Sequence, residues 1–329
     1  MNRKTQKIVL AVVGLLVLFF PVLVPIPYYV HALFTVFLMA TMGLGWNLIG
    51  GYGAQLSLGH SVFFSIGAYS AVLLVIYRHV TPFLGVFLGV VLACVAAVLI
   101  GLPCFRLRGP FFTLATIAAG EITRTLLLHF QEFTGGANGV PLPFRGNDAL
   151  FLQFDSKAPY YYIALAMMVA VFLIVRRLET AKIGRYLAAI REDQEAAESL
   201  GIQSDRVKMI ALLISAAITA VCGVLYAFTL AYIDPDGVAS LNLSIEIATV
   251  VIVGGIGTLW GPVLGAAVVV LLTELTNMYL GSVSGASLVL YGLLLMVVVL
   301  VRPRGLISLA ERPQPKPSPQ EAGARAHSA

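Results

Sequence analysis

Residues 189–201 read Ala189-Ile190-Arg191-Glu192-Asp193-Gln194-Glu195-Ala196-Ala197-Glu198-Ser199-Leu200-Gly201. They belong to the charged segment 176–208, which separates two blocks of apolar sequence. Asp193 suits the start of a short helix, where the helix dipole favours negative charge, and Gly201 suits the left-handed residue after its end. One face of this helix carries Ile190, Ala197 and Leu200, with Ala196 beside them. The small side chains favour a role in docking another protein; the alternative is an ordinary solvated loop helix.

The composition indicates a membrane protein. Of the 329 residues, 59% are hydrophobic and 11% are charged, whereas about a quarter of a soluble domain is charged. The mean hydropathy is +0.92, and the apolar runs approach the ~20 residues that a spanning helix needs. The basic residues behind the net charge of +5 lie in short loops between these runs, a distribution that sets membrane orientation and disfavours nucleic-acid binding. We therefore predict an all-α, polytopic transmembrane helical bundle in the lipid bilayer.

About ten apolar segments are predicted to enter the membrane. They cover residues 8–24, 30–49, 62–77, 83–102, 111–130, 159–175, 208–231, 243–256, 262–280 and 286–301. Alternating them from a cytoplasmic N-terminus puts fourteen Lys and Arg residues inside and three, Arg78, Arg145 and Lys157, outside. Because basic loops stay cytoplasmic, both termini and segment 176–208 are predicted to lie on the cytoplasmic side of the inner (cytoplasmic) membrane. The membrane domain is predicted to cover 1–309, followed by a disordered Pro-rich tail, 310–329.

Two glycine-rich stretches are predicted to break their membrane segments. Gly50-Gly51-Tyr52-Gly53 leads to Gly59, and 204 residues later Gly254-Gly255-Ile256-Gly257 leads to Gly261. Dense glycine destabilises a continuous helix, and broken helices at membrane depth are buried in protein or line a cavity. Paired breaks in two halves point to a transport pathway, so these glycines are candidates for lining it. Close helix packing through small residues is the alternative.

Two ionisable residues, Glu121 and Arg124, lie within the apolar segment 111–130. They are three residues apart and so share a helix face. Charged groups in a membrane are costly, and they usually face a bundle interior or a wet cavity. A structural ion pair between the two is the preferred interpretation. Contact with a substrate or a gate is the alternative, under which Glu121 would line the pathway.

Other kinds of site are disfavoured by the sequence. Cys94, Cys104 and Cys222 form no CxxC pair, have no His at ligand spacing and are expected to be buried thiols, so no metal site is predicted. No nucleophile–base pair appears, and the G-x-x-x-x-G-K-[ST] phosphate loop is absent from the sequence. The chain is therefore predicted to be neither an enzyme nor the ATPase of a transporter.

Several stretches together resemble one family, the LivM-type permeases of branched-chain amino-acid ABC importers. These stretches are Gly53-Ala54-Gln55-Leu56-Ser57-Leu58-Gly59-His60, Arg108-Gly109-Pro110-Phe111-Phe112-Thr113-Leu114-Ala115-Thr116, Gly120-Glu121-Ile122, Thr134-Gly135-Gly136, Ala189-Ile190-Arg191-Glu192-Asp193 and Gly254-Gly255-Ile256-Gly257-Thr258-Leu259-Trp260-Gly261-Pro262. The string Glu195-Ala196-Ala197, followed after three residues by Gly201, resembles the cytoplasmic coupling motif of ABC importer permeases. The resemblance runs from about Leu44 to Glu274.

The resemblance implies a permease subunit that forms a pathway for branched-chain or related apolar amino acids. Its implied partners are a second related permease subunit, two cytoplasmic ATPase subunits and an external substrate-binding protein. ATP would be bound by the ATPase subunits, and no cofactor is expected in this chain. Coupling to the ATPase would involve Asp193, Glu195, Ala196, Ala197, Leu200 and Gly201. Related permeases also serve urea and short amides, which is the alternative; a self-contained secondary transporter or channel is the rival class.

Overall fold

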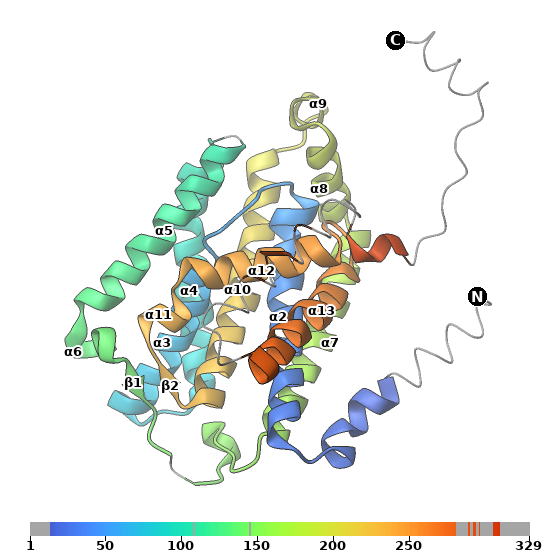
Figure 1. Ribbon diagram of the computed structural model, residues 1–329. Helices are drawn as coiled ribbons and strands as arrows, with labels where there is room; N and C mark the ends of the chain where they lie inside the picture. The colour runs from blue at the N-terminus through green and yellow to red at the C-terminus, as the bar shows by residue number, and fades with distance from the viewer. Residues whose placement is uncertain are drawn as a thin grey trace.

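The fold is a bundle of helices (Figure 1). The computed structural model describes residues 14–107, 109–144, 146–280 and 305–309, together with the single positions 289, 292, 293 and 296. Within these residues regular structure is helical apart from one sheet of two very short strands. Eight of the described helices are long and apolar enough to cross a membrane. The prediction of an all-α, polytopic bundle is confirmed.

The long helices are α2 (Pro27–Asn47), α3 (His60–Arg78), α4 (Pro82–Cys104), α5 (Pro110–His129), α7 (Ala158–Thr180), α10 (Ser204–Leu230), α12 (Leu241–Gly254) and α13 (Gly261–Leu280). The short elements are η1 (Leu48–Tyr52), α6 (Gln131–Thr134), η2 (Gly136–Asn138), β1 (Val140–Pro141), η3 (Ala149–Phe151), α8 (Lys182–Glu192), α9 (Gln194–Ser199), β2 (Tyr232–Ile233), α11 (Pro235–Val238) and η4 (Leu306–Leu309).

The predicted count of ten segments is approximate. Eight of them correspond to the described long helices. Of the segment predicted at 8–24, the structure describes a shorter apolar helix, Gly14–Leu23. Apart from single positions, the segment predicted at 286–301 lies outside the described residues, as does the tail 310–329.

Proline marks the starts of several long helices. α2, α4 and α5 begin at Pro27, Pro82 and Pro110. The first amides of a helix have no partner within it, so the amide that proline lacks is not missed there, and its fixed φ already suits the helix.

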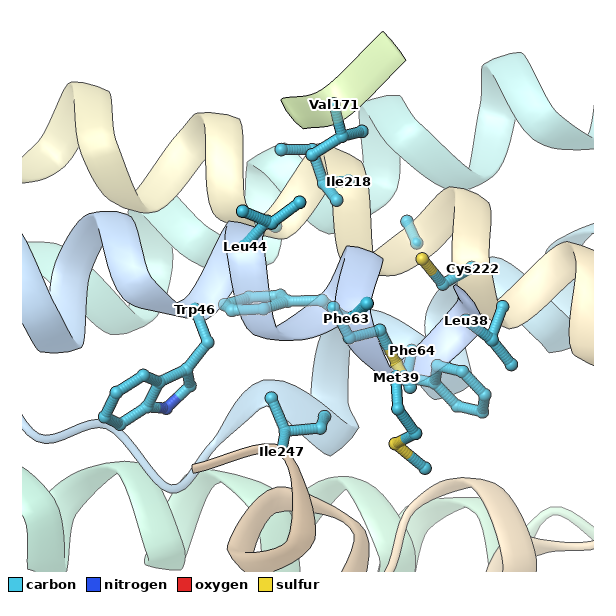
Figure 2. Close-up of a cluster of buried hydrophobic side chains, with 14 of the residues drawn as sticks. Leu38, Met39, Leu44, Trp46, Phe63, Phe64, Val171, Ile218, Cys222 and Ile247 are labelled. Atoms are coloured by element: carbon cyan, nitrogen blue, oxygen red, sulfur yellow. The ribbon is translucent and has the colours of Figure 1, made fainter. Parts of the chain in front are cut away.

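The core forms around α2, and other long helices contribute side chains to it. α2 is largely buried, whereas α4 and α5 are largely exposed and lie at the periphery. Figure 2 shows buried Trp46, Phe63, Val171, Ile218 and Ile247, which come from α2, α3, α7, α10 and α12 in turn. Because lipid tails are as apolar as these side chains, close packing has to supply much of the stability of such a bundle.

Two glycines bring α3 and α10 into backbone contact. A Cβ atom on Gly67 would overlap the carbonyl of Ala220, and a Cβ on Gly223 would overlap the carbonyl of Phe64. Each helix therefore supplies the gap that the other's backbone fills. This close approach holds α10 against α3 along the middle of the bundle.

The connecting elements gather at the two ends of the bundle. Figure 1 shows α8 and α9 at one end and α6, β1 and β2 at the other. β1 and β2 pair antiparallel, with Val140 opposite Ile233. Lys157 Nζ donates a hydrogen bond of 2.7 Å to the carbonyl of Thr229 in the last turn of α10. Alternation of the segments predicts that the loops after α5 and after α10 lie on the same side of the membrane. In the structure these two loops lie together.

We predict that Gly223→Val lowers the stability of the bundle by roughly 1–3 kcal/mol, the usual cost of overpacking. The added side chain would push α10 away from the Phe64 carbonyl. The check is the thermal unfolding of purified protein in detergent. Gly14→Val is the matched control, since a Cβ at Gly14 meets no atom within 4 Å. Equal unfolding temperatures for the two variants would contradict the packing role of Gly223.

Candidate functional site

The α8–α9 segment, Lys182–Ser199, contains the capped helix that the sequence predicts. Asp193 is the N-cap of α9, and its Oδ1 accepts hydrogen bonds from the amides of Glu195 at 2.9 Å and Ala196 at 3.0 Å. Such a side chain satisfies amides that the first turn leaves without a helical partner. The predicted start of the helix is confirmed at Asp193.

The end of α9 is fixed by Gly201. This residue has φ +85°, in the region that costs a side chain energy. The amide of Gly201 donates to the carbonyl of Glu198 at 2.9 Å, and the amide of Ile202 donates to that of Ala197 at 3.1 Å. These two bonds form a Schellman motif, which stops the helix and turns the chain toward α10.

The predicted docking face of α9 needs a correction. Ala197 is only 3% exposed, and Ile190 is buried as well, so both pack inside this chain. Leu200, which the sequence placed on the same face, is 84% exposed. Asp193, with extended backbone, separates α8 from α9, so Ile190 does not lie on one continuous helix with Leu200, a break that helical spacing alone does not show. The surface open to another protein includes Ala196 and Leu200, and Ala197 is excluded from it.

Lys208 ties α9 to the next membrane helix, and the sequence analysis gave it no role. It lies in the first turns of α10 and is 1% exposed. Its Nζ donates a hydrogen bond of 2.7 Å to Oε1 of Gln194, the first residue of α9. A buried ammonium needs such partners. A lysine at the start of an apolar run is the one sequence signal for a buried, paired ammonium. The pairing with Gln194 could not be predicted, because it depends on the turn at Gly201.

The two glycine-rich breaks meet each other next to this segment. Asn47, the last residue of α2, is fully buried. Its Nδ2 donates to the carbonyl of Thr258 at 2.9 Å, and its Oδ1 accepts from the amide of Gly257 at 2.8 Å. A Cβ on Gly51 would lie 2.6 Å from the same Gly257 amide. One amide side chain therefore joins stretches that are more than 200 residues apart in sequence.

The α8 helix contacts both breaks. The guanidinium of Arg191 lies against Gly257, where a Cβ atom would overlap it. Tyr52 of η1 lines a small apolar cavity together with Gly184 and Leu187 of α8. A displacement of α8 would therefore reach η1 and the loop between α12 and α13 at once.

The predicted breaks are real, and close packing explains most of their glycines. η1 is a π-helix, and the chain is non-helical from Gly53 to Gly59 and from Gly255 to Trp260. A Cβ atom on Gly50 would overlap the ring of Trp46, and a Cβ atom on Gly254 would overlap the carbonyl of Gly261. Three further glycines also pack closely: Gly53 is buried against Ile49, Gly59 lies against Thr116, and Gly261 lies against Gly255. Lining of a pathway by these glycines stays a prediction.

The loop after η1 is fixed by hydrogen bonds to α2 and α5. Trp46 Nε1 donates to the carbonyl of Ser57 at 2.7 Å. The amide of Leu58 donates to Thr116 Oγ1 at 3.0 Å, and Thr113 Oγ1 donates to the carbonyl of Leu56 at 2.7 Å. These bonds satisfy backbone groups that the broken helix leaves open, which is what non-helical backbone in a membrane protein requires.

At the other end of the bundle, Arg124 has a stronger partner than the predicted one. Its Nη1 lies 3.8 Å from Glu121 Oε2, so the predicted pair exists as an ionic contact. Its Nε, however, donates a hydrogen bond of 2.8 Å to Asp236 Oδ1 on α11, and its Nη2 bonds to the same oxygen. Asp236 lies 112 residues from Arg124 in the chain, and no sequence pattern links the two. That link depends on how α11 folds back onto the bundle.

A cavity of about 910 Å³ lies between α3, α4 and α5. Its walls are mostly apolar, and include Leu73 of α3, Leu92 of α4 and Leu127 of α5. Tyr69 also lines it; the side chain is buried, and its hydroxyl has no hydrogen-bond partner among the described residues.

We predict that Asn47→Ala destabilises the protein by roughly 1–3 kcal/mol for each buried group left unpaired. The groups are the amide of Gly257 and the carbonyl of Thr258. Thermal unfolding in detergent is the measurement. Asn242→Ala, on the exposed side of α12, is the control and should unfold like the parent protein. If both variants unfold at the same temperature, Asn47 does not hold the two breaks together.

Comparison with known proteins assigns this architecture to a family. The sequence model described as "Branched-chain amino acid transport system / permease component" matches residues 28–299. The chain is 31% identical over 297 residues to the high-affinity branched-chain amino acid transport system permease protein LivM of Escherichia coli (strain K12), covering 84% of this chain and 68% of that protein.

Two further relatives are more distant. The permease protein LivH of the same system in Escherichia coli (strain K12) is 26% identical over 287 residues, covering 83% of this chain and 92% of LivH. The probable LivM of Methanocaldococcus jannaschii is 24% identical over 236 residues, covering 67% of each. No solved structure matches the chain.

The family match includes nearly all of α2, the described helices from α3 to α13, both glycine-rich breaks and the α8–α9 segment. The resemblance that the sequence motifs carry is thereby confirmed, and this chain belongs to the family of branched-chain amino acid transport system permease components.

Proposed function

We propose that the chain is the permease subunit of an ATP-driven importer of branched-chain amino acids, and that the α8–α9 segment receives the motion of an ATPase. The observation that carries the proposal is the attachment of this segment. Lys208 joins it to α10, and Arg191 lies on the break that Asn47 joins to α2. A docked protein that moved α8 and α9 would therefore act on α2, on α10 and on the loop between α12 and α13.

A coupling element has to be firm at both ends. Asp193 and the Schellman motif at Gly201 define α9 by hydrogen bonds on either side, and buried Ile190 and Ala197 anchor it to the bundle. Ala196 and Leu200 remain exposed for contact with a partner. An ordinary solvated loop helix would not need this degree of attachment.

The proposed class of protein, an ATP-driven importer, implies several partner subunits. The chain has no phosphate-binding loop in its sequence, so ATP would be bound by two separate cytoplasmic subunits. A second, related permease subunit would complete the pathway, and an external substrate-binding protein would deliver the ligand. The names of the relatives LivM and LivH both specify high-affinity branched-chain amino acid transport, which supports this substrate class.

The orientation follows from the basic residues. Two basic residues, Arg176 and Arg177, lie just before the α8–α9 segment, and α8 itself contains Lys182, Arg185 and Arg191. Such clusters stay on the cytoplasmic side. We therefore place α8 and α9 in the cytoplasm and β1 and β2 outside, in the inner membrane, with both termini cytoplasmic. The end with α8 and α9 is called the inner end below, and the end with β1 and β2 the outer end.

Arginine on the exposed surface of α9 should release the ATPase. We predict that Ala196→Arg and Leu200→Arg reach the membrane at normal levels and lose the ATPase on purification, because an unpaired charge buried in an interface costs about 3–5 kcal/mol. Co-purification with a tagged permease is the measurement. Asn147→Arg, in the loop at the other end of the bundle, is the control and should retain the ATPase.

Ala197→Arg should behave differently from these two variants. Ala197 is buried in the chain itself, so this change is expected to lower the yield of folded protein. Retention of the ATPase by both Ala196→Arg and Leu200→Arg, with full uptake, would exclude this surface as the docking site.

Cysteine labelling tests the orientation. We predict that Ser199→Cys in intact cells is shielded from a membrane-impermeant maleimide and becomes reactive in inverted vesicles, whereas Asn147→Cys shows the opposite pattern. The reason is the excess of basic residues around α8 and α9. Labelling of Ser199→Cys from the cell exterior would reverse the proposed topology and place the docking surface on the wrong side for an ATPase.

A further inference from the structure

Three charged side chains lie together on an exposed surface near the outer end. Glu121 and Arg124 come from α5, and Asp236 comes from α11. The side chain of Glu121 is 49% exposed, and that of Asp236 is 61% exposed. Glu121 and Asp236 each lie within 4 Å of the guanidinium of Arg124.

This surface is unsuited to lipid tails. Ionisable groups in membrane helices face the bundle interior or a water-filled space, and α5 is a peripheral helix with most of its surface exposed. α4 exposes Leu84, Phe87 and Leu102, which suit lipid, and α5 exposes Ile122 and Leu126 as well as its two charged residues. The charged surface on α5 and α11 therefore marks the side of the subunit that faces an aqueous space, as a translocation pathway between two permease subunits requires.

The three groups leave N–H donors of Arg124 and the carboxylate of Glu121 open. Asp236 occupies Nε and Nη2 of Arg124, while Nη1 faces Glu121 at 3.8 Å, beyond hydrogen-bond distance. Within the described part of the chain, the carboxylate of Glu121 accepts no hydrogen bond and has this ionic contact only. A guanidinium N–H and a carboxylate thus stand side by side, each with unused bonding capacity.

We propose that Glu121 and Arg124, with Arg124 positioned by Asp236, form a binding site for the ammonium and carboxylate groups of the transported amino acid at the outer mouth of the pathway. The proposal rests on the proposed function, which supplies the substrate class. An α-amino acid carries both charges on one carbon. Its carboxylate would accept from Nη1 of Arg124, and its ammonium would donate to Glu121.

An apolar surface for the ligand's side chain lies within one helical turn. Thr123 and Leu127 flank Arg124 on α5 and line the 910 Å³ cavity. Tyr69, whose buried hydroxyl has no hydrogen-bond partner among the described residues, lines the same cavity. The cavity is mostly apolar, as small-molecule sites usually are, and the three charged residues stand outside its lining, with Arg124 next to Thr123 in the chain.

The test measures the binding of L-leucine to the purified full-length chain in detergent. The readout is saturation-transfer NMR of the ligand methyl groups. Isoamylamine, which lacks the carboxylate, and 4-methylpentanoate, which lacks the ammonium, are the comparison ligands. We expect leucine to bind more tightly than either. Glu121→Gln and Arg124→Gln should each weaken leucine binding about tenfold or more, the loss expected when a hydrogen bond to a charged group is removed.

The pattern across ligands separates binding from folding. Glu121→Gln should leave 4-methylpentanoate binding unchanged, and Arg124→Gln should leave isoamylamine binding unchanged. Glu132→Gln on α6 and Arg177→Gln on α7 make the same charge changes at exposed positions and should bind leucine like the parent chain. Unchanged leucine binding in Glu121→Gln and Arg124→Gln, or an equal loss for all three ligands, would overturn the site.

ATP-driven leucine uptake by the parent importer, reconstituted with its partner subunits, tests the proposed function separately. Absence of uptake in the parent would refute the importer itself. Normal uptake in the parent together with normal leucine binding by the Arg124→Gln chain would refute the site alone.

Discussion

The hydrogen bonds of Asn47 are the interaction on which the inner half of the bundle depends. α2 loses its regular hydrogen bonding at η1, and α12 ends at Gly254, so both helices leave backbone groups open near the same point. In a lipid environment such groups have to be satisfied within the protein. One buried amide at the end of α2, with a donor and an acceptor on the same side chain, satisfies two backbone groups of the loop after α12.

That junction explains why the glycines occur in two distant groups. Gly51 and Gly257 have to be small because each lies against the other's stretch, and Gly257 also makes room for Arg191. The two groups are therefore complementary halves of one contact. The same contact places the α8–α9 segment where a force applied from the inner end is divided between α2, α10 and the loop before α13.

Local features of the sequence predicted local structure well. The Asp193 cap, the left-handed Gly201 and the two glycine-rich breaks follow from backbone rules that depend on few neighbours. The outcomes that could not be predicted depend on tertiary placement. Ala197 is buried and Leu200 is exposed although both belong to the end of one short helix, and Asp236 reaches Arg124 only because α11 packs against α5. The bond from Lys208 to Gln194 has the same origin, since both residues lie beside the turn that Gly201 makes.

α10 is long enough to connect the inner end of the bundle to the outer end. At 1.5 Å per residue, its 27 residues form a rod about 40 Å long. Lys208 attaches the α9 helix near one tip of this rod, and the chain leaves the other tip through β2 into α11, which carries Asp236. α10 therefore joins the attachment of α9 at the inner end to the segment that carries Asp236 at the outer end through one continuous helix.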